Sequence, residues 1–246
     1  NEPFCSSYLG YEIGVHAPGI VGREFGRKAA HHLLLGHGLA MQVLAKNSPN
    51  TLNGIVLNFT PCYSVTQSED DLKATAFADD YINQWYMQPV MQGKYPDIKQ
   101  LPKAHRPDIL DGDMEIIAQP LDYLGVNFYT RMHYQASETD FYHELPHKAP
   151  MTDIGWEIYP KALTELLVSL NEKYTLPPIY ITENGAAMAD EFKDGEVKDN
   201  DRIEYYHEHL NALHNATEQG VKVDGYFAWS LMDNFEWAEG YLKRFG

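Results

Sequence analysis

Four short stretches of the chain are apolar almost without a break, and polar residues follow them. These stretches are residues 54–60, 122–129, 178–182 and 224–230. Near-continuous apolar runs of this length are typical of strands that are buried on both faces of a parallel sheet. The pattern therefore predicts four buried strands, separated by long and uneven connections.

Helical segments lie before and between these strands. Residues 23–46 place Ala30, Leu34 and Met41 on one face at a spacing close to 3.6 residues per turn. Similar periodicity predicts helices in three further segments, at residues 70–92, 160–174 and 201–219. Strands that alternate with helices indicate right-handed βαβ crossovers, so the predicted fold class is α/β with a parallel sheet.

Polar side chains stand where the predicted strands end. Tyr129 ends the second strand and Glu183 directly follows the third, while Glu2 lies at the start of the chain. In a barrel of parallel strands, the carboxyl ends of the strands build the active site. We therefore expect Glu183 to point into a site that Glu2 faces. An exposed or salt-bridged carboxylate is the alternative for Glu183, because single exposed acids are common.

Charge and composition narrow the choice of partners. The 35 acidic residues outnumber the 19 Lys and Arg, and the net charge of −16 makes nucleic acid an unfavourable partner. No apolar run approaches the length of a membrane span, and no signal peptide opens the sequence, so we expect a cytoplasmic protein without a membrane partner. Because the first residue is Asn1 and not Met, we also expect that something has been removed before it.

No cofactor or metal is expected from the sequence. The chain has eleven His, but His207 lacks a second His four residues later, where Asn211 stands. No glycine-rich nucleotide motif and no pair of closely spaced cysteines occurs. Cys5 and Cys62 are expected to be reduced, and Cys5 is expected to be a packed thiol.

Several motifs carry a specific resemblance over the whole chain. The strongest are NEP at residues 1–3, ITENG at 181–185 and WSLMDNFEW at 229–237; further landmarks in the same order are HAPG at 16–19, HLLL at 32–35, GKYP at 93–96 and GWEIYP at 155–160. Together they resemble family 1 of the glycoside hydrolases, the β-glucosidase family. NEP alone would be a weak signal, but the three strongest motifs in this order form a specific one.

The resemblance implies a (β/α)8 TIM barrel, of which this chain supplies strands five to eight and the tip of strand four. Residues 1–246 are then a single, partial domain that lacks the N-terminal strands and the last helix. Four strands do not close a barrel, and unpaired edges with an exposed inner face favour association. We therefore expect either a missing N-terminal half or a homo-oligomer partner.

The resemblance also assigns chemical roles to the two carboxyl groups. Glu183 is the implied nucleophile and Glu2 the implied acid/base of a retaining double displacement. Retention predicts that the two carboxyl groups lie ~5–5.5 Å apart. The charge of Glu183 is expected to favour the protonated form of Glu2 in the free enzyme, and esterification of Glu183 removes that effect.

Further residues match the family's sugar-binding groups. The implied substrate-binding residues are Asn1, Asn127, Tyr129, Trp156, Trp229, Glu236, Trp237 and Phe245. Tyr129 matches a Tyr that contacts the nucleophile and helps to keep it ionised. Core packing remains the alternative for Trp229 and is favoured for Phe245. Because Glu236 and Trp237 are both present and no Lys adjoins them, a neutral sugar is favoured over a 6-phospho-sugar.

The resulting hypothesis is a retaining β-glycosidase. Its expected substrates are small β-glucosides or cello-oligosaccharides, and β-galactosides or β-fucosides are further candidates. The alternative is a non-catalytic half-barrel that needs a complementary chain or segment, because part of the sugar site would lie before residue 1.

Overall fold

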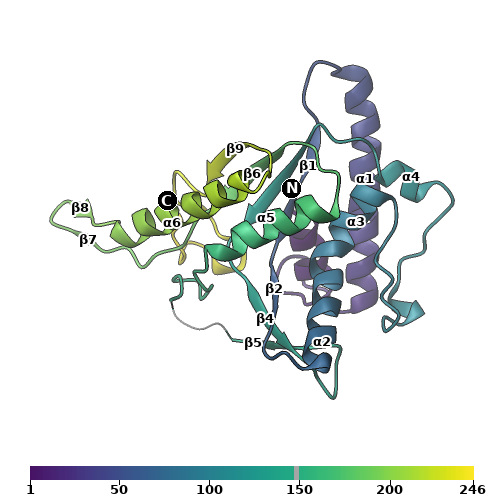
Figure 1. Ribbon diagram of the computed structural model, residues 1–246, viewed down its shortest axis with the longest axis horizontal. Coiled ribbons are helices and arrows are strands. Elements are labelled where there is room, and N and C mark those ends of the chain that lie inside the picture. The colour runs from purple at the N-terminus through teal and green to yellow at the C-terminus, as the bar shows by residue number, and fades with distance from the viewer. Residues whose placement is uncertain (147–149) are drawn as a thin grey trace.

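The computed structural model describes residues 1–146 and 150–246 and is built around one parallel sheet (Figure 1). Its four strands lie side by side in the order β1-β3-β6-β9. They are β1 (Gly54–Phe59), β3 (Tyr123–Phe128), β6 (Ile179–Asn184) and β9 (Val223–Ala228). All three pairings are parallel, so the prediction of a parallel α/β sheet from these four segments is confirmed.

The predicted helices are also found. The α-helices are α1 (Arg23–Asn47), α2 (Glu69–Asp79), α3 (Trp85–Gln92), α4 (Asp113–Ile117), α5 (Lys161–Lys173) and α6 (Asn200–Glu218). The single helix expected over residues 70–92 consists of α2, the π-helical turn η2 (Asp80–Gln84) and α3. In that turn Asn83 exchanges hydrogen bonds with the backbone of Thr60, so the irregular turn supports the end of β1.

Smaller elements were not predicted from the sequence. They are η1 (Cys5–Leu9), β2 (Cys62–Ser64), η3 (Lys103–His105), β4 (Met132–Gln135), β5 (His143–Leu145), β7 (Phe192–Lys193), β8 (Glu196–Val197) and η4 (Trp237–Glu239). Strands β2, β4 and β5 form a second sheet, and β7 pairs with β8 in a short hairpin. Both lie in the connections of the main sheet, and their two- to four-residue strands are too short for a periodic signal.

The two faces of the main sheet have different environments. Leu57, Val126 and Ile181 point towards the helices and are fully buried in the hydrophobic core. The opposite face, where a Cβ on Gly125 would meet Val56 and Thr182, corresponds to the interior of a barrel. The prediction that all four strands are buried on both faces is wrong for β1, β6 and β9. The inner-face residues of β1 and β6 are only partly buried, and β9 is partly or fully exposed throughout, because the described residues leave the inner face incompletely covered.

Strand β6 contains an irregularity that matters for the site. Val126 pairs with Ile181, but the next residue of β3, Asn127, pairs with Glu183. The register with β9 shifts over the same residues of β6. Thr182 is therefore an extra residue, as in a β-bulge. In a regular strand, alternation would place only Thr182 on the inner face and would direct Glu183 to the helix face, on which Ile181 lies.

A buried ion pair fixes the N-terminal segment against α1. Arg27 of α1 is fully buried and donates two hydrogen bonds, of 2.9 and 3.1 Å, to Glu12. A third goes to the backbone oxygen of Tyr81, over whose ring the guanidinium lies 3.9 Å from the centroid. Residues 1–22 are thus joined to both α1 and η2.

The sheet is open at both sides. Apolar side chains are exposed on and after β9, among them Phe227 (56% exposed) and Leu231 (92% exposed). On the other side, α1 exposes Phe25, Leu39 and Val43. Two uncovered apolar surfaces on either side of a four-stranded parallel sheet fit a partial barrel.

Two glycines of α1 allow a matched test of the contact between α1 and α4. A Cβ on Gly38 would lie 1.9 Å from the backbone oxygen of Ile116, whereas a Cβ on Gly36 meets nothing within 4 Å. We expect Gly38→Ala to lower the free energy of unfolding by about 1–3 kcal/mol, because overpacking displaces backbone. Gly36→Ala is expected to raise it by about 0.5–1 kcal/mol through helix propensity. Urea unfolding followed by circular dichroism measures both, and equal effects would contradict the close contact.

Candidate active site

Glu2 is held by its backbone as well as by its side chain. Its N–H donates to Val56 of β1 and its carbonyl accepts from the N–H of Cys5, each at 3.0 Å. Its φ of 43° lies in the left-handed region, which non-glycine residues rarely adopt. The two backbone hydrogen bonds offset the cost of this conformation, and they fix Glu2 against the inner edge of the sheet.

Asn127 connects the two sides of the site. This side chain is fully buried on β3, and its Nδ2 donates to Glu2 Oε1 at 2.8 Å and to Asn1 Oδ1 at 3.3 Å. Its Oδ1 accepts a hydrogen bond of 2.5 Å from Thr182 Oγ1, which fixes the orientation of the amide. The sequence predicted Asn127 as a substrate-binding residue. The structure shows it bonded to Asn1, Glu2 and Thr182, and its contact with substrate stays a prediction.

Glu183 receives hydrogen bonds on both carboxylate oxygens. Tyr129 donates to Oε2 at 2.7 Å, and Asn1 Nδ2 donates to Oε1 at 3.4 Å. Burial raises the pKa of Glu183, and the negative charge of Glu2 adds to this, whereas the hydrogen bonds from Tyr129 and Asn1 lower it. The implied role of Tyr129, to contact the nucleophile and favour its charged form, agrees with this geometry.

Tyr129 also belongs to a group of aromatic side chains. Its ring centroid lies 5.2 Å from that of Trp156 and 6.1 Å from that of Phe245. Phe245 is only 1% exposed, which is consistent with packing, and its role in sugar binding stays a prediction. Burial raises the pKa of Tyr129, and the charge of Glu183 raises it further, so its hydroxyl is a hydrogen-bond donor at neutral pH.

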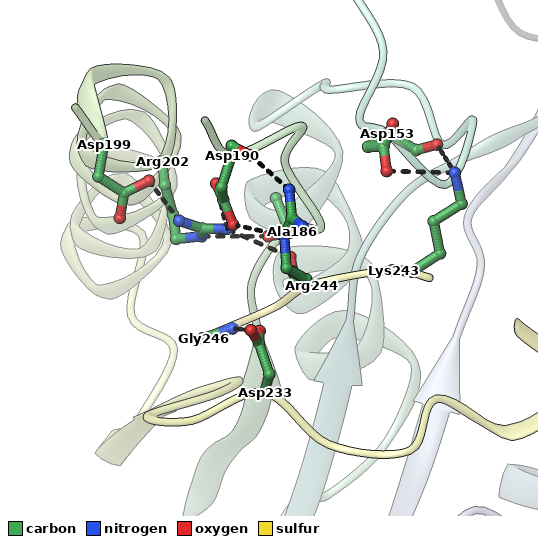
Figure 2. A network of polar contacts seen from close by, with 9 residues as sticks. All are labelled: Asp153, Ala186, Asp190, Asp199, Arg202, Asp233, Lys243, Arg244 and Gly246. Carbon is green, nitrogen blue, oxygen red and sulfur yellow. Dashed lines mark hydrogen bonds and ion pairs between the residues drawn. The ribbon is translucent and has the colours of Figure 1, made fainter. Parts of the chain in front are cut away.

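A network of ion pairs holds the C-terminal segment next to the site. Arg202 of α6 is buried and pairs with Asp190 and Asp199, and Arg244 pairs with the same Asp190 (Figure 2). Lys243 donates to Asp153 at 3.1 Å. The ion pairs of Lys243 and Arg244 thus hold the two residues that directly precede Phe245. A buried Arg that binds two carboxylates fixes geometry more firmly than exposed pairs do.

The remaining predicted sugar-binding residues lie on residues 229–237. Trp229 is partly buried, and its backbone N–H donates to the backbone oxygen of Asn184 at 2.9 Å. Glu236 accepts from Asn234 at 3.0 Å, and its charge contributes, after burial and the two nearer carboxylates, to the raised pKa of Tyr129. Trp237 is 62% exposed and stacks on His16, with the ring centroids 5.3 Å apart.

Sequence reasoning thus located a connected site. The hydrogen-bonded centre joins Asn1, Glu2, Asn127, Tyr129 and Glu183, whereas Trp229, Glu236 and Trp237 share no direct hydrogen bond with the two carboxylates. The separation of ~5–5.5 Å between the two carboxyl groups stays a prediction.

Three contributors were missed, namely Thr182, His16 and the hydrogen bond that Cys5 makes to Glu2. Thr182 belongs to the quoted ITENG motif, whose letters do not reveal the bulge. His16 likewise stands in the HAPG motif, but nothing in the sequence links it to Trp237.

Metal and membrane signals were also sought in the structure. Among residues 1–146 and 150–246, no group of three His, Cys, Asp or Glu side chains has the geometry to bind a metal ion. Over the same residues, no helix is both long and apolar enough to cross a membrane.

Comparison with known proteins agrees with the geometry. The sequence profile of glycosyl hydrolase family 1 matches residues 1–246. The whole chain is 41% identical to a β-glucosidase of Agrobacterium sp. and 39% identical to a bifunctional β-D-glucosidase/β-D-fucosidase of Bifidobacterium breve, and it covers 55% and 57% of them. The crystal structure of a β-glucosidase from Exiguobacterium marinum superposes on the whole chain with a TM-score of 0.95 at 42% identity, over 58% of its own length.

The chain therefore spans little more than half the length of the relatives it matches. The match nevertheless extends over every residue of this chain, and the neighbour's fold agrees with the four-stranded partial barrel. This protein belongs to glycosyl hydrolase family 1.

Proposed function

We propose that this chain carries the catalytic centre of a retaining β-glycosidase that hydrolyses β-glucosides. The observation that supports this most directly is the pairing of Glu2 and Glu183 through Asn1 and Asn127. Asn1 donates to Glu183 and accepts from Asn127, which also donates to Glu2. Two carboxyl groups from different elements, joined by shared amides, are the groups that a double displacement needs.

In the first step, Glu183 attacks the anomeric carbon of the sugar. A bond forms between a Glu183 carboxylate oxygen and this carbon, while the bond to the leaving-group oxygen breaks. Glu2 donates its proton to that oxygen, so the aglycone departs as a neutral alcohol. The products are a glycosyl ester on Glu183 and an ionised Glu2.

In the second step, water releases the sugar. Glu2 removes a proton from a water molecule, whose oxygen attacks the anomeric carbon and breaks the ester bond. Glu183 regains its negative charge and Glu2 regains its proton. Because each displacement inverts the anomeric carbon, the product keeps the β configuration.

A neutral sugar suits the charge of the site. Burial raises the pKa of Tyr129, and the carboxyl groups of Glu183, Glu2 and Glu236 lie near enough to raise it further, so the site is rich in acidic groups. A phosphate on the sugar would be repelled there unless a cation compensated for it. The relatives include a protein named for β-D-glucosidase and β-D-fucosidase activity, which supports β-fucosides as further substrates of this chain.

A second candidate function follows from the open sides of the sheet. Phe227 and Leu231 near β9, and Phe25 and Val43 of α1, expose apolar surface on either side of the partial barrel. The chain also spans little more than half of its relatives. On this alternative, the chain binds sugar only weakly and acquires activity when a complementary segment or a second copy covers these surfaces.

Hydrolysis of a nitrophenyl β-glucoside tests both candidates. We expect the purified chain to release nitrophenol and Glu183→Gln to lower the rate by on the order of 10³-fold or more, because the nucleophile is lost. Light scattering on the same sample shows whether the active species is a monomer or an oligomer. Equal rates in the chain and the variant would contradict the proposed nucleophile. No turnover by a chain with a folded far-ultraviolet spectrum would favour the second candidate.

The preference for neutral sugars has its own test. In the species that shows turnover, a nitrophenyl β-glucoside 6-phosphate should react roughly tenfold more slowly than the unphosphorylated glucoside, because of like-charge repulsion. Glu236→Gln should reduce this difference, since it removes the repulsion between the Glu236 carboxylate and the phosphate. The ratio of kcat/KM for the two substrates measures the effect, and an unchanged ratio would show that Glu236 does not set the preference.

The hydrogen bond from Tyr129 can be tested without turnover. Tyr129→Phe removes a bond that favours ionised Glu183, so the pKa of Glu183 should rise further above its usual range. The carboxyl ¹³C signal, assigned by its loss in Glu183→Gln, reports this pKa during a pH titration. Tyr123→Phe, on the same strand but at its other end, is the matched control and should leave the signal unchanged. A pKa that does not rise in Tyr129→Phe would contradict the assigned role.

A further inference from the structure

We propose that Cys5 is a positioning residue for the acid/base Glu2 and that its thiol marks Oε2 as the oxygen that carries the proton. The proposal deepens the proposed function and rests on it for the role of Glu2. It starts from a contact that the sequence did not predict. The Sγ of Cys5 donates a hydrogen bond of 3.1 Å to Glu2 Oε2.

Backbone geometry ties this contact to the conformation of Glu2. Cys5 begins the π-helical turn η1, and its N–H donates to the carbonyl of Glu2 at 3.0 Å. Glu2 has its φ in the left-handed region, and its side chain lies within hydrogen-bond distance of the first residue of this turn. Cys5 thus binds Glu2 twice, once through the backbone and once through the thiol.

The thiol remains protonated at neutral pH. Burial raises the pKa of Cys5 far above its ordinary value, and the adjacent Glu2 charge raises it further. A protonated thiol is a poor nucleophile, so a catalytic role of its own is not supported. It is instead a weak hydrogen-bond donor, and its nearest acceptor is a carboxylate oxygen.

The two oxygens of Glu2 have unequal donors. Oε1 accepts a 2.8 Å hydrogen bond from the amide of Asn127, which is held in place by Thr182. From the described part of the chain, Oε2 accepts a hydrogen bond only from the thiol. An amide is a much stronger donor than a thiol. Protonation of Oε2 therefore loses a weaker hydrogen bond than protonation of Oε1 would. An acid/base must exist in both protonation states, and a weak donor on Oε2 permits both.

Infrared spectroscopy tests the contact without catalysis. In the Cys62→Ala background, the S–H stretching band reports Cys5 alone. We expect this band to shift to higher frequency as the pH falls and Glu2 is protonated, because the thiol then loses its carboxylate acceptor. In Glu2→Gln this pH dependence should disappear. A band that is independent of pH in the parent chain would overturn the proposal, and Cys62→Ser provides the same reading if Cys62→Ala does not fold.

The pH–rate profile provides the functional measurement. Cys5→Ser places a stronger donor beside Oε2 and should move the basic limb to lower pH by roughly half a pH unit, whereas Cys5→Ala should move it to higher pH. Cys62→Ser makes the same thiol-to-hydroxyl change away from the two carboxylates and should leave the limb in place. Lower rates with unmoved limbs would show that Cys5 serves packing alone and would overturn the proposal.

The two measurements separate this inference from the proposed function. A pH-dependent S–H band in a chain that shows no turnover would support the Cys5 contact and count against hydrolysis by this chain alone. Turnover together with a pH-independent band would support hydrolysis and overturn the role of Cys5.

Discussion

The extra residue in β6 determines which side chains reach the catalytic position. A strand directs successive side chains to opposite faces, and Ile181 of β6 faces the helices. Regular alternation would turn Glu183 into the same apolar core, where an ionised carboxylate is very costly. Because Thr182 is inserted into the register, Thr182 bonds Asn127 while Glu183 bonds Tyr129. The bulge therefore places the side chains of the consecutive residues Thr182 and Glu183 on the same face of the sheet.

The donors around the two carboxylates balance the cost of partial burial. Burial and mutual repulsion both disfavour the charged form of Glu183, and the hydrogen bonds from Tyr129 and Asn1 oppose them. Asn127 can donate to Glu2 because its oxygen is already occupied by Thr182. The orientation of the buried Asn127 amide thus links the bulge in β6 to Glu2, and a few directional hydrogen bonds organise the site.

Apolar runs and motifs predicted the four strands and the helices, and they singled out Glu2 and Glu183, which the structure links through Asn1 and Asn127, because burial and strand-end chemistry are properties of short segments. The bulge could not be predicted in this way, since Ile179–Thr182 reads as an uninterrupted strand. The contact between His16 and Trp237 depends on how distant segments meet in space, and no local pattern encodes it. Burial of β9 was overestimated for a related reason. Its apolar sequence is suited to a closed barrel, whereas β9 is the edge strand of an open sheet here and is partly or fully exposed.

The two ends of the site differ in how far they depend on a complementary wall. Glu2, Asn127 and Glu183 are held by β1, β3 and β6, which pair with one another inside this chain. Glu236 and Trp237 follow the edge strand β9 and belong to a largely exposed segment, which is anchored at its far end through Arg244. The open edge of the sheet therefore gives Glu236 and Trp237 less support than Glu2 and Glu183 receive. On this reasoning, disturbing that edge displaces Glu236 and Trp237 before it displaces the two hydrogen-bonded carboxyl groups.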